Sequence, residues 1–136
     1  MIDCENKVID TVAAPLRAEY PGIFIPSEYV PIPKSFPTVS IIQMDNYTYT
    51  KSMTIDGVEH QAVSPFEINV YSDLVSGKKE QCKAIMSSVD TLMQGLGFTR
   101  KGMSPREVPN AEKSICRMIA RYDALAGENN EIYKTK

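Results

Sequence analysis

Apolar residues recur at helical spacing in two stretches of the chain. In the first, a stripe repeats every fourth residue at Val8, Val12, Leu16 and Tyr20. Asp3 is the predicted N-cap, and residues 20–22 are expected to end the helix. Pro15 falls inside this stretch. Because a proline ring clashes with the carbonyl four residues earlier, a kink or a restart is expected there.

The second helical stretch is longer and more regular. Its apolar positions follow the spacing 3-1-3-3-1-3 of one wide stripe, formed by Cys82, Ile85, Met86, Val89, Leu92, Met93 and Leu96. Ser76 is the predicted N-cap, and Gly95 or Gly97 supplies the positive φ that commonly ends a helix. A stripe of Met and Leu is typical of a helix packed on a sheet.

Strand-like patterns occupy much of the remaining chain, at residues 39–44, 66–71, 98–103 and 115–125. A proline-containing loop is expected at 104–112. The proline-rich residues 23–37 admit only a short strand at a sheet edge, because proline cannot donate to a ladder. The order helix, strands, helix, strands predicts an α+β fold. In it, an antiparallel or mixed sheet of four to five strands carries two α-helices on one face.

An Asp-Gly pair at 56–57 predicts a long projecting β-hairpin. This pair favours a type I′ turn, in which both positions need positive φ. The arms would run over residues 39–55 and 58–71, and at ~3.3 Å per residue each would reach roughly 45 Å. That is too long to cover one small core, so the tip at 47–64 is expected to project from the domain.

The pairing register of this hairpin contains a conflict. If residues are paired outward from a two-residue turn at 56–57, polar residues of the first arm lie opposite the apolar residues of the second arm. A shift of one residue puts Met44 opposite Ile68 and Ile42 opposite Val70. Because a one-residue slip reverses every side chain, we expect a β-bulge at 64–65 or 45–46.

Composition places the chain among ordinary globular proteins. Its 136 residues, 43% hydrophobic and 24% charged, predict one domain over 1–136 with a loose polar tail at about 127–136. No run of 18 apolar residues suggests a membrane span, and the acidic N-terminus lacks the apolar region of a secretory signal. We therefore expect a cytoplasmic site of synthesis. The odd number of cysteines, Cys4, Cys82 and Cys116, predicts buried thiols rather than disulfides.

Charge is mildly asymmetric along the chain, although the net charge is only −2. Residues 1–50 carry three bases and six acids, whereas residues 101–136 carry seven bases and five acids. A nucleic-acid footprint would need a strongly basic face, so none is predicted.

Candidate chemistry is sparse. His60 is the single histidine and lies beside the predicted turn, with no second ligand or orienting carboxylate implied. Lys78 and Lys79 at a helix start could meet a phosphate, but solvated helix-end charges are the better interpretation. Arg117 and Arg121 share one strand face, where a solvated surface and salt bridges to a neighbouring subunit are equally favoured. No catalytic residue, cofactor or metal site is predicted.

Several segments, in order, resemble the tail terminator, or tail completion, proteins of long-tailed bacteriophages. They are Ser35-Phe36-Pro37-Thr38-Val39-Ser40-Ile41 with Met44-Asp45-Asn46, Glu67-Ile68-Asn69-Val70-Tyr71-Ser72, Gly77-Lys78-Lys79, Leu96-Gly97-Phe98, and Arg117 with Arg121-Tyr122. They span about residues 35–125, and their order and spacing carry the resemblance. The first helix and the proline-rich segment match least well.

The resemblance implies a structural virion protein whose subunits close into a hexameric ring in the tail or neck, assembled in the host cytoplasm. Such a ring caps the tail tube and joins it to the head connector. The implied partners are other copies of the chain, the tail tube protein and a head-completion or connector protein. DNA would only pass through the lumen, and no membrane is involved.

A ring needs heterologous contacts, for which the hairpin tip and the open sheet edge are candidates. The predicted interface residues are Tyr47, Tyr49, Lys51, Met53, Ile55, Val58, His60, Arg117 and Arg121. Two other functions stay open: a different neck protein, such as a head-completion or connector adaptor, and a small-molecule or regulatory binding module. An enzyme fits least, because ionisable groups other than ordinary carboxylates and amines are few.

Overall fold

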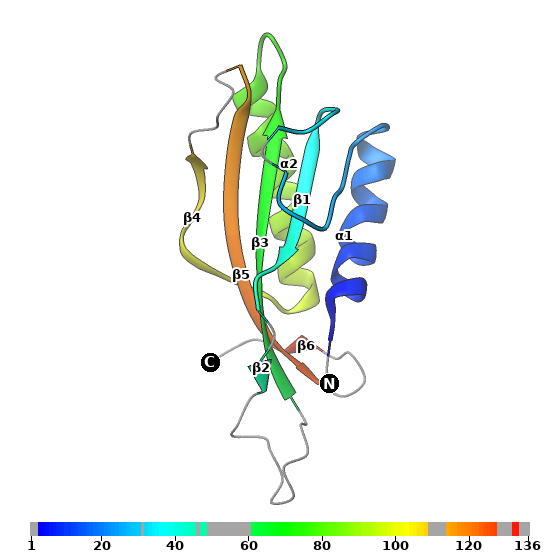
Figure 1. Ribbon diagram of the computed structural model, residues 1–136, viewed down its shortest axis with the longest axis vertical. Helices are drawn as coiled ribbons and strands as arrows, with labels where there is room; N and C mark the ends of the chain where they lie inside the picture. Colours follow the sequence, from blue (N-terminus) through cyan, green and yellow to red (C-terminus); the bar gives the residue numbers. More distant parts are fainter. Residues whose placement is uncertain are drawn as a thin grey trace, which may run out of the picture.

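The computed structural model describes residues 3–30, 32–45, 47–48, 61–108, 114–127 and 132–133. Its elements are α1 (Glu5–Glu19), β1 (Thr38–Gln43), β2 (Tyr47–Thr48), β3 (Gln61–Ser72), α2 (Lys78–Leu96), β4 (Thr99–Val108), β5 (Cys116–Gly127) and β6 (Ile132–Tyr133). The four long strands form an antiparallel sheet in the order β1-β3-β5-β4 (Figure 1). The two-residue strands β2 and β6 extend it by pairing with β3 and β5. The predicted α+β fold is confirmed.

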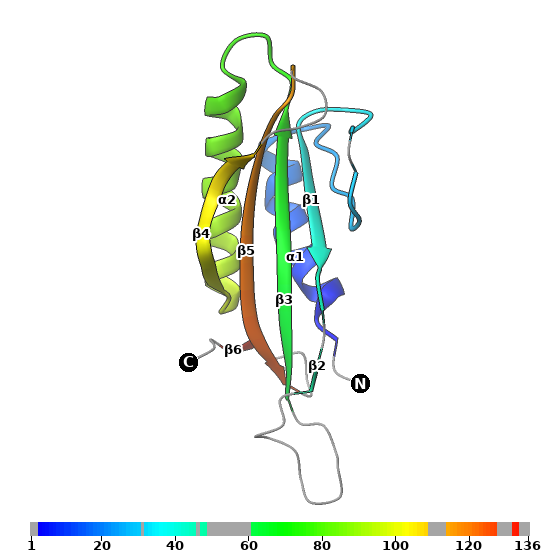
Figure 2. The same ribbon diagram turned by 60° about the vertical axis from the view of Figure 1, so that its left-hand side comes forward.

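Both helices cover the same face of the sheet (Figure 2), and the core lies between the two layers. The predicted stripe of α1 supplies Val8, Val12 and Leu16, and that of α2 supplies Ile85, Val89 and Met93, all fully buried. Alternate residues of the central strands meet them: Phe66, Ile68, Val70, Ala120, Tyr122 and Ala124. Each large apolar side chain buried in this way stabilises the fold by about 1.5–3 kcal/mol.

The helix ends differ in part from the prediction. α1 begins at Glu5 with Cys4 as its N-cap, while the Asp3 carboxylate accepts a hydrogen bond from the Glu5 N–H at 3.0 Å. The expected restart at Pro15 is wrong, because α1 runs through this exposed proline to Glu19. Pro15 has no N–H to donate to the carbonyl of residue 11, so the helix continues without that hydrogen bond.

The second helix confirms one predicted end and corrects the other. Gly77, not Ser76, is the N-cap of α2, and its φ of +83° is one that glycine adopts without strain. Gly97 ends the helix with φ of +106°, as predicted. A side chain on Gly97 would approach the carbonyl oxygen of Ile132 to 3.0 Å, so this close approach also requires glycine.

The pairing of β1 with β3 differs from the expected register. Val39 lies opposite Val70 and Ile41 opposite Ile68, instead of Ile42 and Met44. Val39 and Ile41 are buried, whereas Met44 is exposed, so the opposite set of β1 side chains faces the core. The register then changes by one before β2, because three residues of one strand face two of the other between 43–66 and 47–63. This irregularity lies where the bulge was predicted. The predicted pairing of β1 with β3, however, is wrong.

Two further sequence predictions are corrected near the sheet margin. Residues 104–108, expected to be loop, belong to β4, whose pairing with β5 shifts between Lys101 and Arg106 and so accommodates the extra residues. In the supposedly loose tail, Ile132 and Tyr133 pair with Ala126 and Leu125 as β6. The hairpin tip at 49–60 lies outside the described residues.

The proline-rich segment covers the outer side of β1. Phe24 forms a parallel bridge with Thr38, and the Phe24 and Pro26 carbonyls accept hydrogen bonds from the Val39 and Ile41 N–H groups at 2.9 and 3.0 Å. The segment lies at the sheet edge, as the sequence suggested, but it forms a single bridge and not a strand. On the opposite side of the sheet, β4 has no further strand beside it within the described ranges.

Candidate assembly interface on the open sheet face

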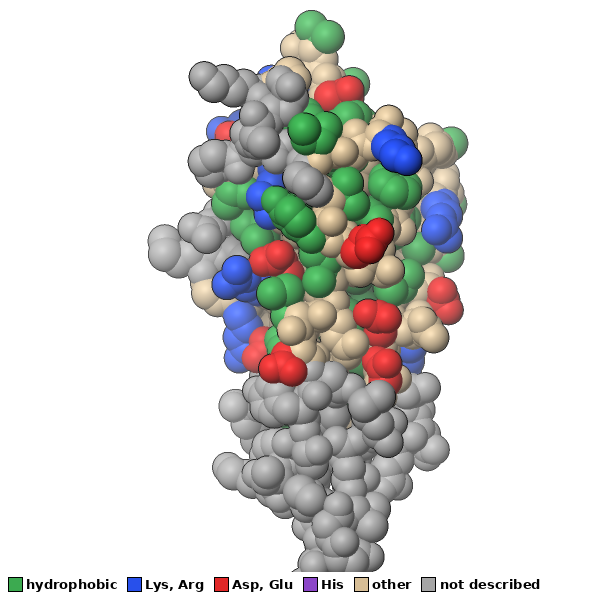
Figure 3. Space-filling model, in the orientation of Figure 1, with side chains coloured by type: hydrophobic (Ala, Val, Ile, Leu, Met, Phe, Trp, Pro, Cys, Tyr) green, Lys and Arg blue, Asp and Glu red, His purple; other side chains and the backbone are tan. Residues whose placement is uncertain are grey.

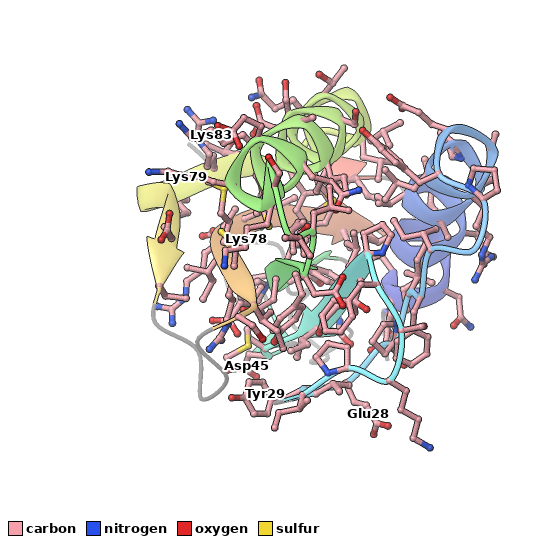
Figure 4. All side chains as sticks on the ribbon, turned by 90° about the horizontal axis from the view of Figure 1, so that it is seen from above. Glu28, Tyr29, Asp45, Lys78, Lys79 and Lys83 are labelled. Atoms are coloured by element: carbon pink, nitrogen blue, oxygen red, sulfur yellow. The ribbon has the colours of Figure 1, made fainter. Side chains whose placement is uncertain are left out.

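The face of the sheet turned away from the helices is the most organised polar surface that the structure describes. Strand alternation places Glu67, Asn69 and Tyr71 of β3 on it. Their neighbours across β5 are Arg121, Ile119 and Arg117. Figure 4 shows the layers from above: the helices lie on one side of the sheet, and Glu28 and Tyr29 lie on the other.

Four polar side chains form a continuous ladder on this face. Arg121 meets one Glu67 carboxylate oxygen through Nε at 3.2 Å and Nη2 at 3.1 Å. The other carboxylate oxygen accepts a hydrogen bond from Asn69 Nδ2 at 3.3 Å. Arg117 Nε then donates to Asn69 Oδ1 at 2.9 Å. The row Arg121–Glu67–Asn69–Arg117 is called the arginine ladder below.

The inner members of the arginine ladder are buried and its basic ends reach the surface. Asn69 is fully buried and the Glu67 side chain is only 10% exposed, whereas the Arg121 side chain is 62% exposed. Burying a carboxylate without partners would be costly, and here both of its oxygens are bonded. The ladder therefore holds guanidinium groups in fixed positions at the surface.

Aromatic rings complete the Arg117 end of the ladder. The Arg117 guanidinium carbon lies 5.5 Å from the centre of the Tyr29 ring and 5.8 Å from that of Tyr71. Burial raises the pKa of Tyr71, while the nearby Arg117 charge acts to lower it. Stacking on two rings fixes the planar group, as cation–π contacts do at recognition surfaces.

Exposed apolar side chains lie at both ends of the arginine ladder. Tyr29, beside Arg117, is 54% exposed, and Met44, which lines a depression together with Arg121, is 52% exposed. The loop that carries Tyr29 is attached to the sheet by a hydrogen bond from Ser40 Oγ to the Glu28 carbonyl at 3.0 Å. Figure 3 shows this face, on which apolar side chains lie among separated acidic and basic groups. Mixed apolar and arginine surfaces of this kind are typical of protein interfaces.

A shallow depression lies at the Arg121 end of the face. It has a volume of about 360 Å³ and is lined by Met44, Pro65, Phe66, Lys101, Arg121, Tyr122 and Asp123. Lys101 and Asp123 face each other at 4.0 Å across β4 and β5. The lining combines an apolar base with both signs of charge, which suits a protein side chain better than a strongly charged ligand.

The structure brings together only part of the predicted interface set. Arg117 and Arg121 lie on this face, but both bind side chains of their own chain, an arrangement that neither sequence interpretation included. Tyr47 belongs to β2, which pairs with β3. The other six, Tyr49, Lys51, Met53, Ile55, Val58 and His60, lie outside the described residues.

Sequence reasoning missed Glu67, Asn69 and Tyr29. The first two alternate with core residues, so they were assigned to the surface and given no role. Acidic and amide residues at positions 67 and 69 of one strand, with arginines at 117 and 121 of another, were the available signal. Only the β3–β5 register shows that these pairs face each other.

The remaining candidate chemistry is structural in the described residues. Cys82 donates weak hydrogen bonds to the Val70 and Cys116 carbonyls at 3.6 and 3.4 Å, and burial raises the pKa of its thiol. All three cysteines are buried and unpaired, as predicted. Lys78 Nζ donates to the Ser114 carbonyl at 3.4 Å. No cluster of three metal-binding side chains occurs in the part of the chain that is described.

Comparisons with other proteins add no family. No protein-family model matches the chain, and no curated protein matches its sequence. No helix in the described ranges is long and apolar enough to cross a membrane. The open face is therefore interpreted from its own geometry.

Proposed function

We propose that the chain is a structural virion protein whose copies form a ring. This ring caps a phage tail tube and joins it to the head connector. The observation that carries the proposal is the arginine ladder, on a sheet face that no helix or strand of the described residues covers. Arginines at interfaces contribute most where their geometry is fixed before binding, because each mobile side chain immobilised on binding costs about 0.5–1.5 kcal/mol.

The surroundings of the arginine ladder support an assembly role. Tyr29 and Met44 place apolar area beside the basic ends of the ladder, and β4 has no further strand beside it among the described residues. A cyclic ring joins one surface of a subunit to a different surface of the next. The open face is the proposed first surface. The proposed second is the hairpin tip predicted from the sequence, without residues 61–64, which belong to β3 and pair with β5.

The order of elements also agrees with the resemblance stated for residues 35–125. That resemblance implies an α+β subunit, and its segments fall on β1, β3, the start and end of α2, and β5. Glu67 and Asn69, with Arg117 and Arg121, belong to those segments and form the ladder. The residues that carry the resemblance are thus the residues proposed to form the interface.

The experiment is to measure the mass of the purified chain by light scattering over a range of concentrations. Negative-stain images are recorded with and without tail tubes. Rings with a central hole, bound at tube ends, are expected. Arg121→Ala should shift assembly to higher concentration, whereas Arg17→Ala, which removes an exposed arginine from α1, should not. Circular dichroism checks that both variants stay folded.

A particle that remains monomeric at all concentrations, also beside tail tubes, would overturn the proposal. Binding to the head connector with no affinity for tube ends would instead identify a different neck protein. Equal effects of Arg121→Ala and Arg17→Ala would keep the ring but remove the arginine ladder from its interface.

A further inference from the structure

The outer edge of β4 has no strand beside it among the described residues. Residues Thr99–Lys101 pair regularly with Tyr122 and its neighbours in β5, and the register then shifts beyond Lys101. In an antiparallel ladder every second residue directs its N–H and C=O away from the existing partner. An uncovered edge of this kind is a template for strand addition, unless the protein blocks it. The regular run at Thr99–Lys101 can therefore accept a short extended segment.

A groove runs beside this edge on the helical side of the sheet. It has a volume of about 350 Å³ and is lined by Lys83, Met86, Ser87, Asp90, Arg100 and Met118. Met86 and Met118 are 1% and 7% exposed and supply an apolar base. Methionine side chains adapt their shape to the group that lies on them.

The carboxylate in the groove is already occupied by the protein. Asp90 Oδ1 accepts a hydrogen bond from the Tyr122 hydroxyl at 2.7 Å and lies 3.4 Å from Arg100 Nη1. Asp90 Oδ2 accepts one from Gln94 Nε2 at 2.8 Å. The acid of the groove thus faces inward, toward α2 and the sheet.

The basic side of the groove is not balanced in the same way. Lys83 forms no ion pair with a carboxylate of the described ranges, whereas Lys79, one turn earlier, lies 3.6 Å from Glu107. Figure 4 shows that Lys79 and Lys83 project from α2 on the side where β4 lies. Among the described lining residues, Lys83 and Arg100 against Asp90 leave one positive charge in excess.

We infer that the β4 edge and this groove bind an extended segment of a partner protein that places an acidic side chain opposite Arg100. Directly opposed residues of neighbouring strands point to the same face of a sheet, and Arg100 points toward α2. The added side chain would lie on Met86 and Met118, with its carboxylate between Lys83 and Arg100. Backbone pairing supplies the affinity, and the acid supplies the selectivity.

The test uses two blocked seven-residue peptides of alternating Thr and Val that differ only in a central Glu or Gln. Their binding is followed by NMR titration of the labelled chain at a concentration at which it is monomeric. Both should shift the amides of Thr99–Lys101 and slow their hydrogen exchange. The Glu peptide should bind about two- to fivefold more tightly, as expected for one exposed ion pair.

The preference for Glu should disappear in Lys83→Ala and at about 1 M salt, where the screening length is about 3 Å. Lys79→Ala is the matched control and should keep it, because Lys79 is paired with Glu107. Circular dichroism confirms that both variants are folded.

Three results would overturn the inference: no change at the amides of Thr99–Lys101, equal affinity for the two peptides, or protection of those amides by raised protein concentration alone. The third would mean that a second copy occupies the edge. The first two results leave ring formation untouched, and the third overturns the inference while remaining compatible with a ring, so the inference can fail while the proposed function stands.

Discussion

Two buried tyrosines allow the hydrogen bond between α2 and the sheet to be measured against a matched control. Both Tyr122 and Tyr71 are fully buried. The Tyr122 hydroxyl donates to the Asp90 carboxylate at 2.7 Å, whereas the Tyr71 hydroxyl has no partner among the described residues. Burial and the bond to Asp90 both raise the pKa of Tyr122, so the hydroxyl keeps the proton that it donates.

The expected costs of removing the two hydroxyls differ in sign. A hydrogen bond to a charged group contributes about 1.5–3 kcal/mol, and Asp90 is 20% exposed, so part of the loss in Tyr122→Phe is recovered by hydration. We expect Tyr122→Phe to lower the free energy of unfolding by about 1.5 kcal/mol. Tyr71→Phe removes a hydroxyl that is buried without a bond, so it should be neutral or stabilising by up to about 1 kcal/mol.

Urea unfolding followed by circular dichroism, at one low protein concentration, measures both variants. The midpoint should fall for Tyr122→Phe and stay or rise for Tyr71→Phe, with an unchanged slope. In a thermal scan, 1.5 kcal/mol corresponds to a shift of about 5 °C in a domain of this size. Equal costs within about 0.5 kcal/mol, or the reverse order, would show that the Asp90 bond does not fasten α2 to the sheet.

Three further outcomes are expected. Gly97→Ala should destabilise by more than about 1 kcal/mol, because its φ is +106° and an added Cβ would lie 3.0 Å from the backbone of β6. Gly95→Ala, in the same helix but with open space around it, should stabilise by about 0.5–1 kcal/mol, and thermal melts compare the two. Asn69→Ala should lower the free energy of unfolding in urea by about 2–4 kcal/mol, since it leaves one Glu67 carboxylate oxygen and Arg117 Nε without their partner. The partly exposed Ser88→Ala should cost less than about 0.5 kcal/mol. The free energy of unfolding should also fall as the pH rises above about 9, which is the pKa of a thiol in the unfolded chain. Burial raises the pKa of Cys82, so above pH 9 the native state holds a proton that the unfolded chain releases. Unfolding in guanidinium chloride, measured between pH 8 and 10.5, should show this fall in unfolding free energy with pH. The fall should be smaller in Cys82→Ala. An equal fall in both proteins would mean that other groups cause it.

Periodicity alone was enough to predict the core positions of both helices and of β3, but not those of β1. The stripes of α1 and α2 and the alternation of Phe66 with Ile68 depend only on which side chains avoid water, and they appear as expected. The pairing register at the base of a hairpin depends on every bulge between the turn and that point. Counting residues from the turn at 56–57 therefore did not give the partner of Val39. The extra residues of β4 around Gly102 were not separable by pattern from a loop.

The candidate site was predictable only at one of its two strands. Arg117 and Arg121 stood out because charge is unusual on a strand that is otherwise apolar. Glu67 and Asn69 seemed ordinary surface residues, because burial by a cross-strand partner leaves no trace in a single sequence. Tyr29 comes from a proline-rich segment whose path follows from its hydrogen bonds to β1 and the sheet, not from any periodic pattern.

The bridge between Phe24 and Thr38 has a consequence for how copies of the chain can aggregate. It closes one margin of the four-strand sheet with a short segment in which Pro26 has no N–H to offer, whereas β4, at the other margin, has no strand beside it among the described residues. Two molecules joined through their β4 strands would present this proline-containing margin at both ends of the joined sheet. Association by strand pairing should then favour a pair over a fibre.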